Sequence, residues 1–183
     1  MNRIVLTVCI LFFIALIYIA AYSLLPTKPN KTIINQVNNI LKTNKSQIKN
    51  EAYYVIIDYN LPILKKRLWV ISKNSGEIII NSHVSHAWKS GFFTASKFSN
   101  NIGTHKSCKG IFITQNTYFG KFGYSMYIKG IENGVNNNAL KRSIIFHNSY
   151  YLWSDGCFTT LPWINANLIN LIKNGTLIYV HKS

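Results

Sequence analysis

The chain has 183 residues, of which 48% are hydrophobic and 14% are charged, and its formal net charge is +15. An intrinsically disordered protein is excluded, because disordered chains are poor in apolar residues. A nucleic acid is not expected as a partner, since the lysines that carry the charge are scattered and no helix-turn-helix, zinc-finger or RNA-binding aromatic motif accompanies them. The basic surface would suit an anionic cell envelope or wall polymer.

Residues 1–25 contain a long apolar run. No charged residue occurs in 4–25, and a helix of this length, at about 1.5 Å per residue, spans the roughly 30 Å hydrocarbon core of a bilayer. A signal peptide usually has a shorter apolar stretch and a small-x-small cleavage site, for which 21–23 is the candidate. An uncleaved signal-anchor is favoured over a cleaved signal peptide. Lys28 and Lys31 follow the run and only Arg3 precedes it, so the positive-inside rule taken literally would keep the C-terminal part in the cytoplasm. Because long domains are often translocated regardless of flanking charge, 26–183 is expected at the extracytoplasmic, periplasmic face of the cell envelope, membrane-anchored or secreted.

The next segment, 26–52, begins with PTKPNKT and continues with apolar residues at helical spacing, namely Ile33, Ile34, Val37, Ile40 and Leu41. This spacing predicts a linker followed by an amphipathic helix. From residue 53 the pattern changes to short β-rich runs between turn residues, at 53–59, 67–73, 77–84, 110–115, 124–131, 143–149 and 176–182.

A second helix is predicted from residue 162, because Pro162 suits the start of a helix and Gly175 lies just past its end. Many short strands and few helices indicate a mainly β domain over 53–183. We expect a sandwich or barrel-like fold with one or two capping helices, preceded by the N-terminal membrane helix.

Three cysteines occur, and Cys9 lies inside the apolar run. Cys108 and Cys157 are too few for a disulfide scaffold, and no spaced His/Cys set suggests a zinc site, so neither a metal nor a cofactor is expected. A Cys108–Cys157 disulfide in an oxidising compartment and two free thiols both remain open.

The stretch HNSYYLWSDGC, 147–157, brings a histidine at a strand end close in sequence to a cysteine behind a glycine. A thiol becomes a useful nucleophile when a neighbouring base takes its proton. Gly156 would let the backbone approach a substrate carbonyl, and amide groups around it could bind an oxyanion. From the residues alone, an inert buried Cys157 and a structural His147 are the commoner case.

The segment DYNLPILKKRLWVISKNSGEIIINSHVSHAWKSG, 58–91, resembles the murein L,D-transpeptidase catalytic-domain family, in which a strand ends in a V-x-H-x-x-x-S-G motif that VSHAWKSG fits. FSN at 98–100, SCKGIF at 107–112, YFGKFGYSMYIKGIE at 118–132 and NNNALKRSIIFH at 136–147 continue the likeness in order. SDGC at 154–157 then falls at the family's S-x-G-C nucleophile motif. The likeness covers 54–179.

By this resemblance, Cys157 is the nucleophile, His147 is the base, and the carbonyl of Asn148 orients the imidazole. Ser154 and Gly156 shape the cysteine loop. The resemblance also implies a cleft lined by three further residues, His86, Ser90 and Tyr124.

The implied reaction cleaves the amide between a diamino acid and D-alanine in a peptidoglycan stem peptide. The enzyme forms a cysteine thioester and cross-links it to an acceptor amine. Two alternatives stay open. With water as acceptor the protein would be an L,D-carboxypeptidase, and without activity it would be a membrane-anchored peptidoglycan-binding protein.

The chain departs from the family pattern at three places. The loop between His147 and Cys157 is short, Asp155 stands where an aromatic residue or histidine is usual, and Phe158 replaces an expected proline. A carboxylate beside the nucleophile would raise its pKa. Cys108 stands where relatives carry a small hydroxyl residue, which predicts a free, structural thiol.

Overall fold

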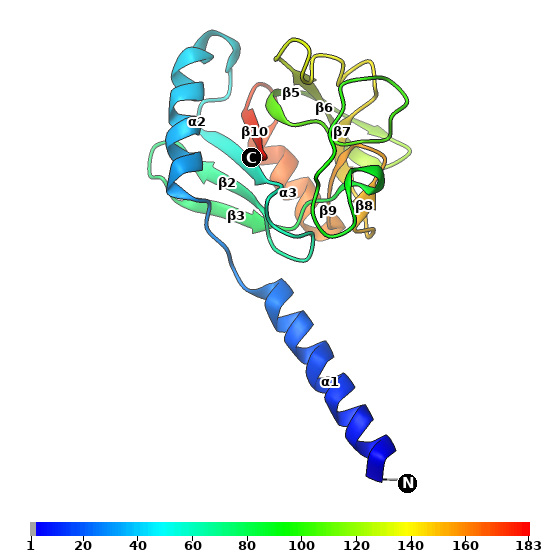
Figure 1. Cartoon of the computed structure of the whole chain (residues 1–183). Coiled ribbons are helices and arrows are strands. Elements are labelled where there is room, and N and C mark those ends of the chain that lie inside the picture. The colour runs from blue at the N-terminus through cyan, green and yellow to red at the C-terminus, as the bar shows by residue number, and fades with distance from the viewer. Residues whose placement is uncertain (1–2) are drawn as a thin grey trace.

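The structure, a computed structural model, describes residues 3–183. Helix α1 (Arg3–Leu24) projects away from the rest of the chain and buries none of its side chains (Figure 1). By length and composition α1 could cross a membrane. A linker leads to helix α2 (Lys31–Thr43), whose first turn is capped by the side chain of Asn30, which accepts a hydrogen bond from the Thr32 amide at 2.9 Å.

The rest of the chain is mainly β-structure, as predicted. Its strands are β1 (Tyr53–Asp58), β2 (Leu68–Ser72), β3 (Ile78–Ser82), β4 (His86–Ala87), β5 (Gly110–Gly120), β6 (Gly123–Gly130), β7 (Ile145–Asn148), β8 (Trp153–Ser154), β9 (Phe158–Thr160) and β10 (Leu177–His181). Helix α3 (Pro162–Ile172) and two short 3₁₀ turns, Lys45–Gln47 and Trp88–Ser90, complete the fold.

One large curved, barrel-like sheet organises the domain. Its strand order is β3-β2-β1-β10-β5-β6-β7-β9, and β4 pairs with β8 in a small second sheet. β1 is buried on both faces: Val55 and Ile57 pack into the core that α3 closes, whereas Tyr54 and Ile56 pack into the core that α2 closes. This two-sided burial explains why β1 reads as a continuous apolar run rather than an alternating one.

The sequence did not predict β4, β8 and β9, which have two or three residues each and are too short to show a periodic pattern. The strand predicted over 110–115 is longer in the structure, because β5 continues to Gly120 and a tight turn joins it to β6. β9 matters most for the site. It pairs in parallel with β7, so that His147 lies opposite Thr159.

Candidate active site

His147 and Cys157 line the same open cleft, whose cavity volume is ≈ 310 Å³. His147 lies near the end of β7, and Cys157 comes directly before β9. The register partner of His147 in β9 is Thr159. The Cys157 thiol donates to the carbonyl oxygen of Ser143, which lies 3.6 Å from its sulfur. The cleft is lined by Trp88, Phe122, His147, Ser149, Tyr151, Trp153, Ser154, Asp155, Cys157 and Thr159.

The His147 imidazole is held in one orientation. Its Nδ1 lies 2.8 Å from the carbonyl oxygen of Asn148, and since a carbonyl can only accept, Nδ1 carries the hydrogen. The Phe122 ring stacks on the imidazole with 4.3 Å between ring centroids. Burial lowers the pKa of His147 below its usual range, although the hydrogen bond to Asn148 opposes this effect. At neutral pH the ring is therefore neutral, with an unprotonated Nε2.

The loop before Cys157 is shaped by Ser154 and Gly156. The Ser154 hydroxyl donates to the Cys157 carbonyl at 2.7 Å and accepts from the Gly156 amide at 3.2 Å. Gly156 has a φ of 129°, and a Cβ at this position would lie 3.3 Å from the Lys106 carbonyl oxygen. A side chain at residue 156 would therefore be strained. The Gly156 amide, expected as an oxyanion donor, is engaged by Ser154 in this structure.

The Cys157 thiol lies in an environment that favours its protonated form. Burial raises the pKa of Cys157, a backbone hydrogen bond and Arg142 lower it, and the carboxylate of Asp155 raises it. Asp155 is held in place by the Trp88 indole, which donates to Oδ1 at 3.1 Å, and by His105, whose Nδ1 lies 3.3 Å from the same oxygen. A thiol of this kind needs a base at the moment of attack.

Arg142 is a functional candidate that the sequence did not reveal. Its guanidinium donates to the Lys106 carbonyl at 2.6 Å and also to the Ser99 carbonyl and the Cys108 sulfur. It also lies beside the loop that carries Gly156. The side chain therefore braces the segment 99–108, against which Gly156 packs, and places a positive charge near the nucleophile. No local motif marks it, since it precedes β7 in an ordinary Lys/Arg pair.

Thr159 is the second candidate that sequence reasoning missed. It is 3% exposed and lines the cleft, and its hydroxyl has no hydrogen-bond partner among residues 3–183. Leaving a buried polar group without a partner costs about 1–3 kcal/mol. Thr159 thus lines the cleft opposite His147 with a hydroxyl that is both unpaired and covered.

His86 was expected to line the cleft, but it is not among the residues that do. It is fully buried, with Nδ1 2.8 Å from Nη2 of Arg67 and Nε2 2.8 Å from the Gly91 carbonyl. Because arginine can only donate, Nδ1 accepts and Nε2 carries the hydrogen. Burial and the neighbouring Arg67 lower the pKa of His86 to about 4. The neutral side chain thus connects β4 to Arg67 and to the backbone at Gly91.

Ser90 and Tyr124 are also absent from the cleft lining. Ser90 is fully buried and accepts a hydrogen bond from the Ser107 amide at 2.8 Å. The Tyr124 hydroxyl donates to Asn170 of α3 at 2.9 Å, and its neighbour Phe122 takes the place against His147. All three residues thus lie outside the cleft lining, with their polar groups bonded to neighbouring parts of the fold.

Core packing accounts for Cys108 and for Phe158, the residue that replaces an expected proline. Cys108 is fully buried, and both Cys108 and Cys157 are free thiols, so the disulfide alternative is not realised in this structure. Burial raises the pKa of Cys108, although Arg142 opposes this effect. Phe158 is fully buried between Phe112 and Phe146, with ring-centroid distances of 5.5 and 6.3 Å, so it serves the core.

Known proteins resemble this arrangement. Residues 26–181 match the family described as L,D-transpeptidase catalytic domain. Among solved structures, the chain is similar to the L,D-transpeptidase of Enterococcus faecium, with 17% identity and a TM-score of 0.46 over 72% of this chain and 50% of that one. It is also similar to the helical cell shape determining protein of Campylobacter jejuni, with 7% identity and a TM-score of 0.51 over 74% of this chain and 49% of that one. No curated protein matches the sequence.

The chain covers about half the length of each of these solved structures. At 7% identity, the likeness to the Campylobacter jejuni protein shows the fold alone. The family match carries more weight, because residues 26–181 include the whole sheet and both His147 and Cys157. The chain therefore belongs to the L,D-transpeptidase catalytic domain family.

Proposed function

We propose that this protein is a cysteine-dependent peptidoglycan L,D-transpeptidase that α1 anchors in the membrane as an uncleaved signal-anchor. In this proposal 1–25 is the anchor, 26–52 is a linker with an amphipathic helix, and 53–183 is the catalytic domain at the extracytoplasmic face. The observation that carries the proposal is the cleft that His147 and Cys157 line together. Membership of the family supports the substrate class, a peptidoglycan stem peptide.

The first half of the reaction forms a thioester. Nε2 of His147 takes the thiol proton as the Cys157 sulfur attacks the carbonyl carbon of the amide between the diamino acid and D-alanine. When the tetrahedral intermediate collapses, the C–N bond breaks and His147 returns the proton to the leaving amine of D-alanine. The diamino acid stays bound to Cys157 through its acyl carbon.

The second half transfers the acyl group. An amine of another stem peptide loses its proton to His147 and attacks the thioester. The C–S bond breaks, and the sulfur regains the proton. No metal or cofactor enters these steps. Water in place of the amine would give the L,D-carboxypeptidase outcome.

The proton is transferred during attack rather than beforehand. The pKa of His147 is lowered and the pKa of Cys157 is raised, which disfavours a resting thiolate–imidazolium pair. The acid limb of the acylation rate should therefore lie below the usual histidine pKa of about 6.5. The same raised thiol pKa, with Asp155 beside it, is the observation that favours the second candidate, a silent peptidoglycan-binding protein.

A carbapenem separates the two candidates, because its strained lactam carbonyl can acylate a nucleophilic cysteine. The full chain in detergent micelles should gain the mass of one carbapenem, on the peptide that contains Cys157. Cys108→Ser should label as the wild type does, and His147→Ala should label more slowly by roughly 10²–10⁴-fold. A folded protein that takes no label would leave the silent binding protein as the better reading.

The acceptor and the location need two further measurements. Muropeptide mass spectrometry of cells with and without the protein distinguishes new cross-links from shortened stems, and so transpeptidase from carboxypeptidase. A reporter fused after Ser183 should be active in its extracytoplasmic version. Activity of a cytoplasmic version would contradict both the location and the substrate.

A further inference from the structure

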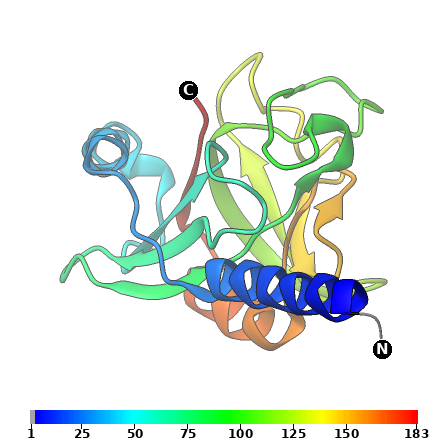
Figure 2. The same cartoon turned by 60° about the horizontal axis from the view of Figure 1, so that its bottom comes forward.

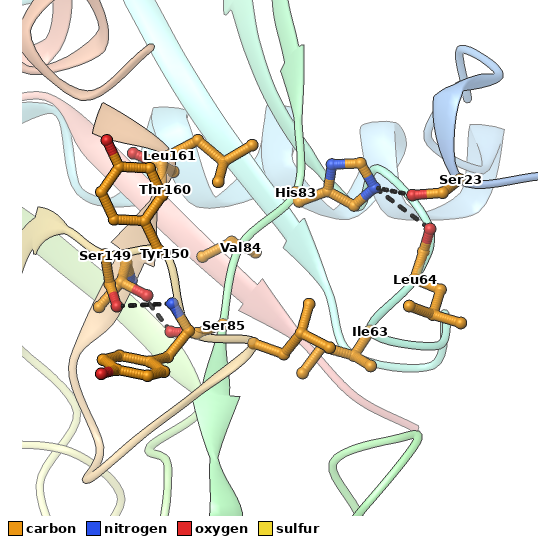
Figure 3. A pocket seen from close by; sticks show the side chains of 13 residues that line it. Ser23, Ile63, Leu64, His83, Val84, Ser85, Ser149, Tyr150, Thr160 and Leu161 are labelled. Atoms are coloured by element: carbon orange, nitrogen blue, oxygen red, sulfur yellow. Dashed lines mark hydrogen bonds between the residues drawn. The ribbon is translucent and has the colours of Figure 1, made fainter. Parts of the chain in front are cut away.

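The chain enters the folded domain almost as soon as α1 ends. Ser23, the penultimate residue of α1, has its hydroxyl 3.0 Å from Nε2 of His83 (Figure 3). Thr27 is fixed twice, by the Asn81 side chain, which accepts from its amide at 2.8 Å, and by the Trp69 indole, which donates to its carbonyl at 2.8 Å. These contacts leave no spacer between α1 and the sheet.

The length of α1 then sets the height of the domain above a membrane. Its 22 residues measure about 33 Å at about 1.5 Å each, against a hydrocarbon core of roughly 30 Å. Tyr18 and Tyr22 stack in its last turns, and the ammonium of Lys65 lies 3.6 Å from the Tyr22 ring centroid. Tyrosine and lysine are typical of the membrane–water interface. The domain surface around Ser23 therefore lies at headgroup level.

Exposed aromatic side chains lie on this surface. Tyr150, Tyr151 and Trp163 are 74%, 82% and 69% exposed, and Leu152 is 42% exposed. We call these four residues the aromatic patch. The Tyr150 and Trp163 ring centroids are 6.3 Å apart, which joins the loop after β7 to the first turn of α3.

The patch lies beside the end of α1. A cavity of ≈ 170 Å³ has Ser23 on one wall and the loop of 149–152 on another (Figure 3). In Figure 2, which brings this end of the molecule forward, α1 passes in front of α3. Patch and helix therefore belong to one end of the molecule.

We propose that the aromatic patch rests on the outer leaflet of the membrane that α1 spans, as a second contact between protein and lipid. This proposal rests on the proposed membrane anchoring. Three observations select lipid as the occupant: continuity of the patch with an apolar helix, its tyrosine and tryptophan rings, and the net charge of +15, which attracts anionic headgroups.

This contact has a consequence for the catalytic cleft. Ser149 and Tyr151 line both the cavity beside α1 and the cleft of His147 and Cys157. With the loop of 149–152 on the bilayer, the cleft opens next to the headgroups, where stem peptides close to the membrane can reach it.

Tryptophan quenching tests the contact in the full chain. The protein is reconstituted into vesicles of phosphatidylcholine and phosphatidylglycerol, with or without lipids brominated near the headgroup end of their acyl chains. Trp163→Phe should lose most of the bromine-dependent quenching. Trp88→Phe removes an indole that is also exposed, 57% against 69%, but lines the cleft, and it should keep the quenching. Thermal unfolding of both variants checks their folding.

Each contrary outcome has its own meaning. Equal quenching in both variants and the wild type overturns the patch contact while the anchoring stands. Protein that does not float with the vesicles overturns the anchoring and the patch contact with it. Trp163 that is shielded from aqueous iodide but not quenched by bromine is covered by protein, such as a second copy of the chain, and this too overturns the lipid contact.

Discussion

Replacing Thr159 with valine removes a buried hydroxyl that lines the cleft and has no partner among the described residues 3–183. Ser85 holds the backbone of Thr159 on both sides, through bonds of 3.1 and 3.0 Å to its amide and carbonyl, so the strand keeps its place when the side chain changes. A buried polar group without a partner costs about 1–3 kcal/mol. We expect Thr159→Val to raise the free energy of unfolding by up to this amount, or Tm by roughly 2–12 °C.

The same change should slow acylation. A hydrogen bond to a neutral partner contributes about 0.5–1.5 kcal/mol, which corresponds to a roughly 2- to 13-fold lower rate if the hydroxyl binds the reacting molecule. The two readouts are the thermal unfolding of the full chain, followed by far-UV circular dichroism, and the second-order rate of carbapenem acylation. Greater stability together with slower acylation would show that the hydroxyl serves the ligand rather than the fold.

The structure supplies a matched control. Thr176 is fully buried and its hydroxyl also has no partner within residues 3–183, but it does not line the cleft. Thr176→Val should therefore raise Tm in the same way and leave the acylation rate unchanged. The reasoning is refuted if Thr159→Val lowers Tm, or if it acylates as fast as the wild type and Thr176→Val.

The sequence predicted the elements whose burial is continuous along the chain. β1 reads YYVII because both of its faces are covered, and α3 is bracketed by Pro162 and Gly175. By contrast, β4, β8 and β9 owe their existence to partners distant in sequence. β9 forms because its three residues lie against β7, and three residues carry no period of their own.

The site divides in the same way. That His147 and Cys157 lie in one cleft could be predicted, because they stand close together in sequence within a recognisable motif order. Arg142 and Thr159 could not, because what marks them is a contact or a missing partner in space. The motif position of His86 was clear from the sequence. Its burial against Arg67 could not be predicted, because the two side chains meet only in the folded chain.

Three further predictions concern charge. Asp155→Asn removes the carboxylate that raises the pKa of Cys157, so the pH midpoint of Cys157 alkylation should fall; an unchanged midpoint contradicts the assigned effect. His86 is buried and neutral with a pKa of about 4, so the unfolded chain binds more protons than the folded chain below about pH 6.5. The free energy of unfolding should therefore fall between about pH 6.5 and 4. Urea unfolding at several pH values measures this loss, and His86→Gln should reduce it. Arg142 lowers the pKa of Cys157 and also braces the segment 99–108 on which the cysteine loop packs, so Arg142→Gln should raise the alkylation midpoint and slow carbapenem acylation. Arg142→Lys separates these effects, because lysine keeps the charge but has no planar fork to reach two carbonyls at once. It should restore the midpoint but not the acylation rate, and a lysine variant that restores both would show that only the charge of Arg142 matters.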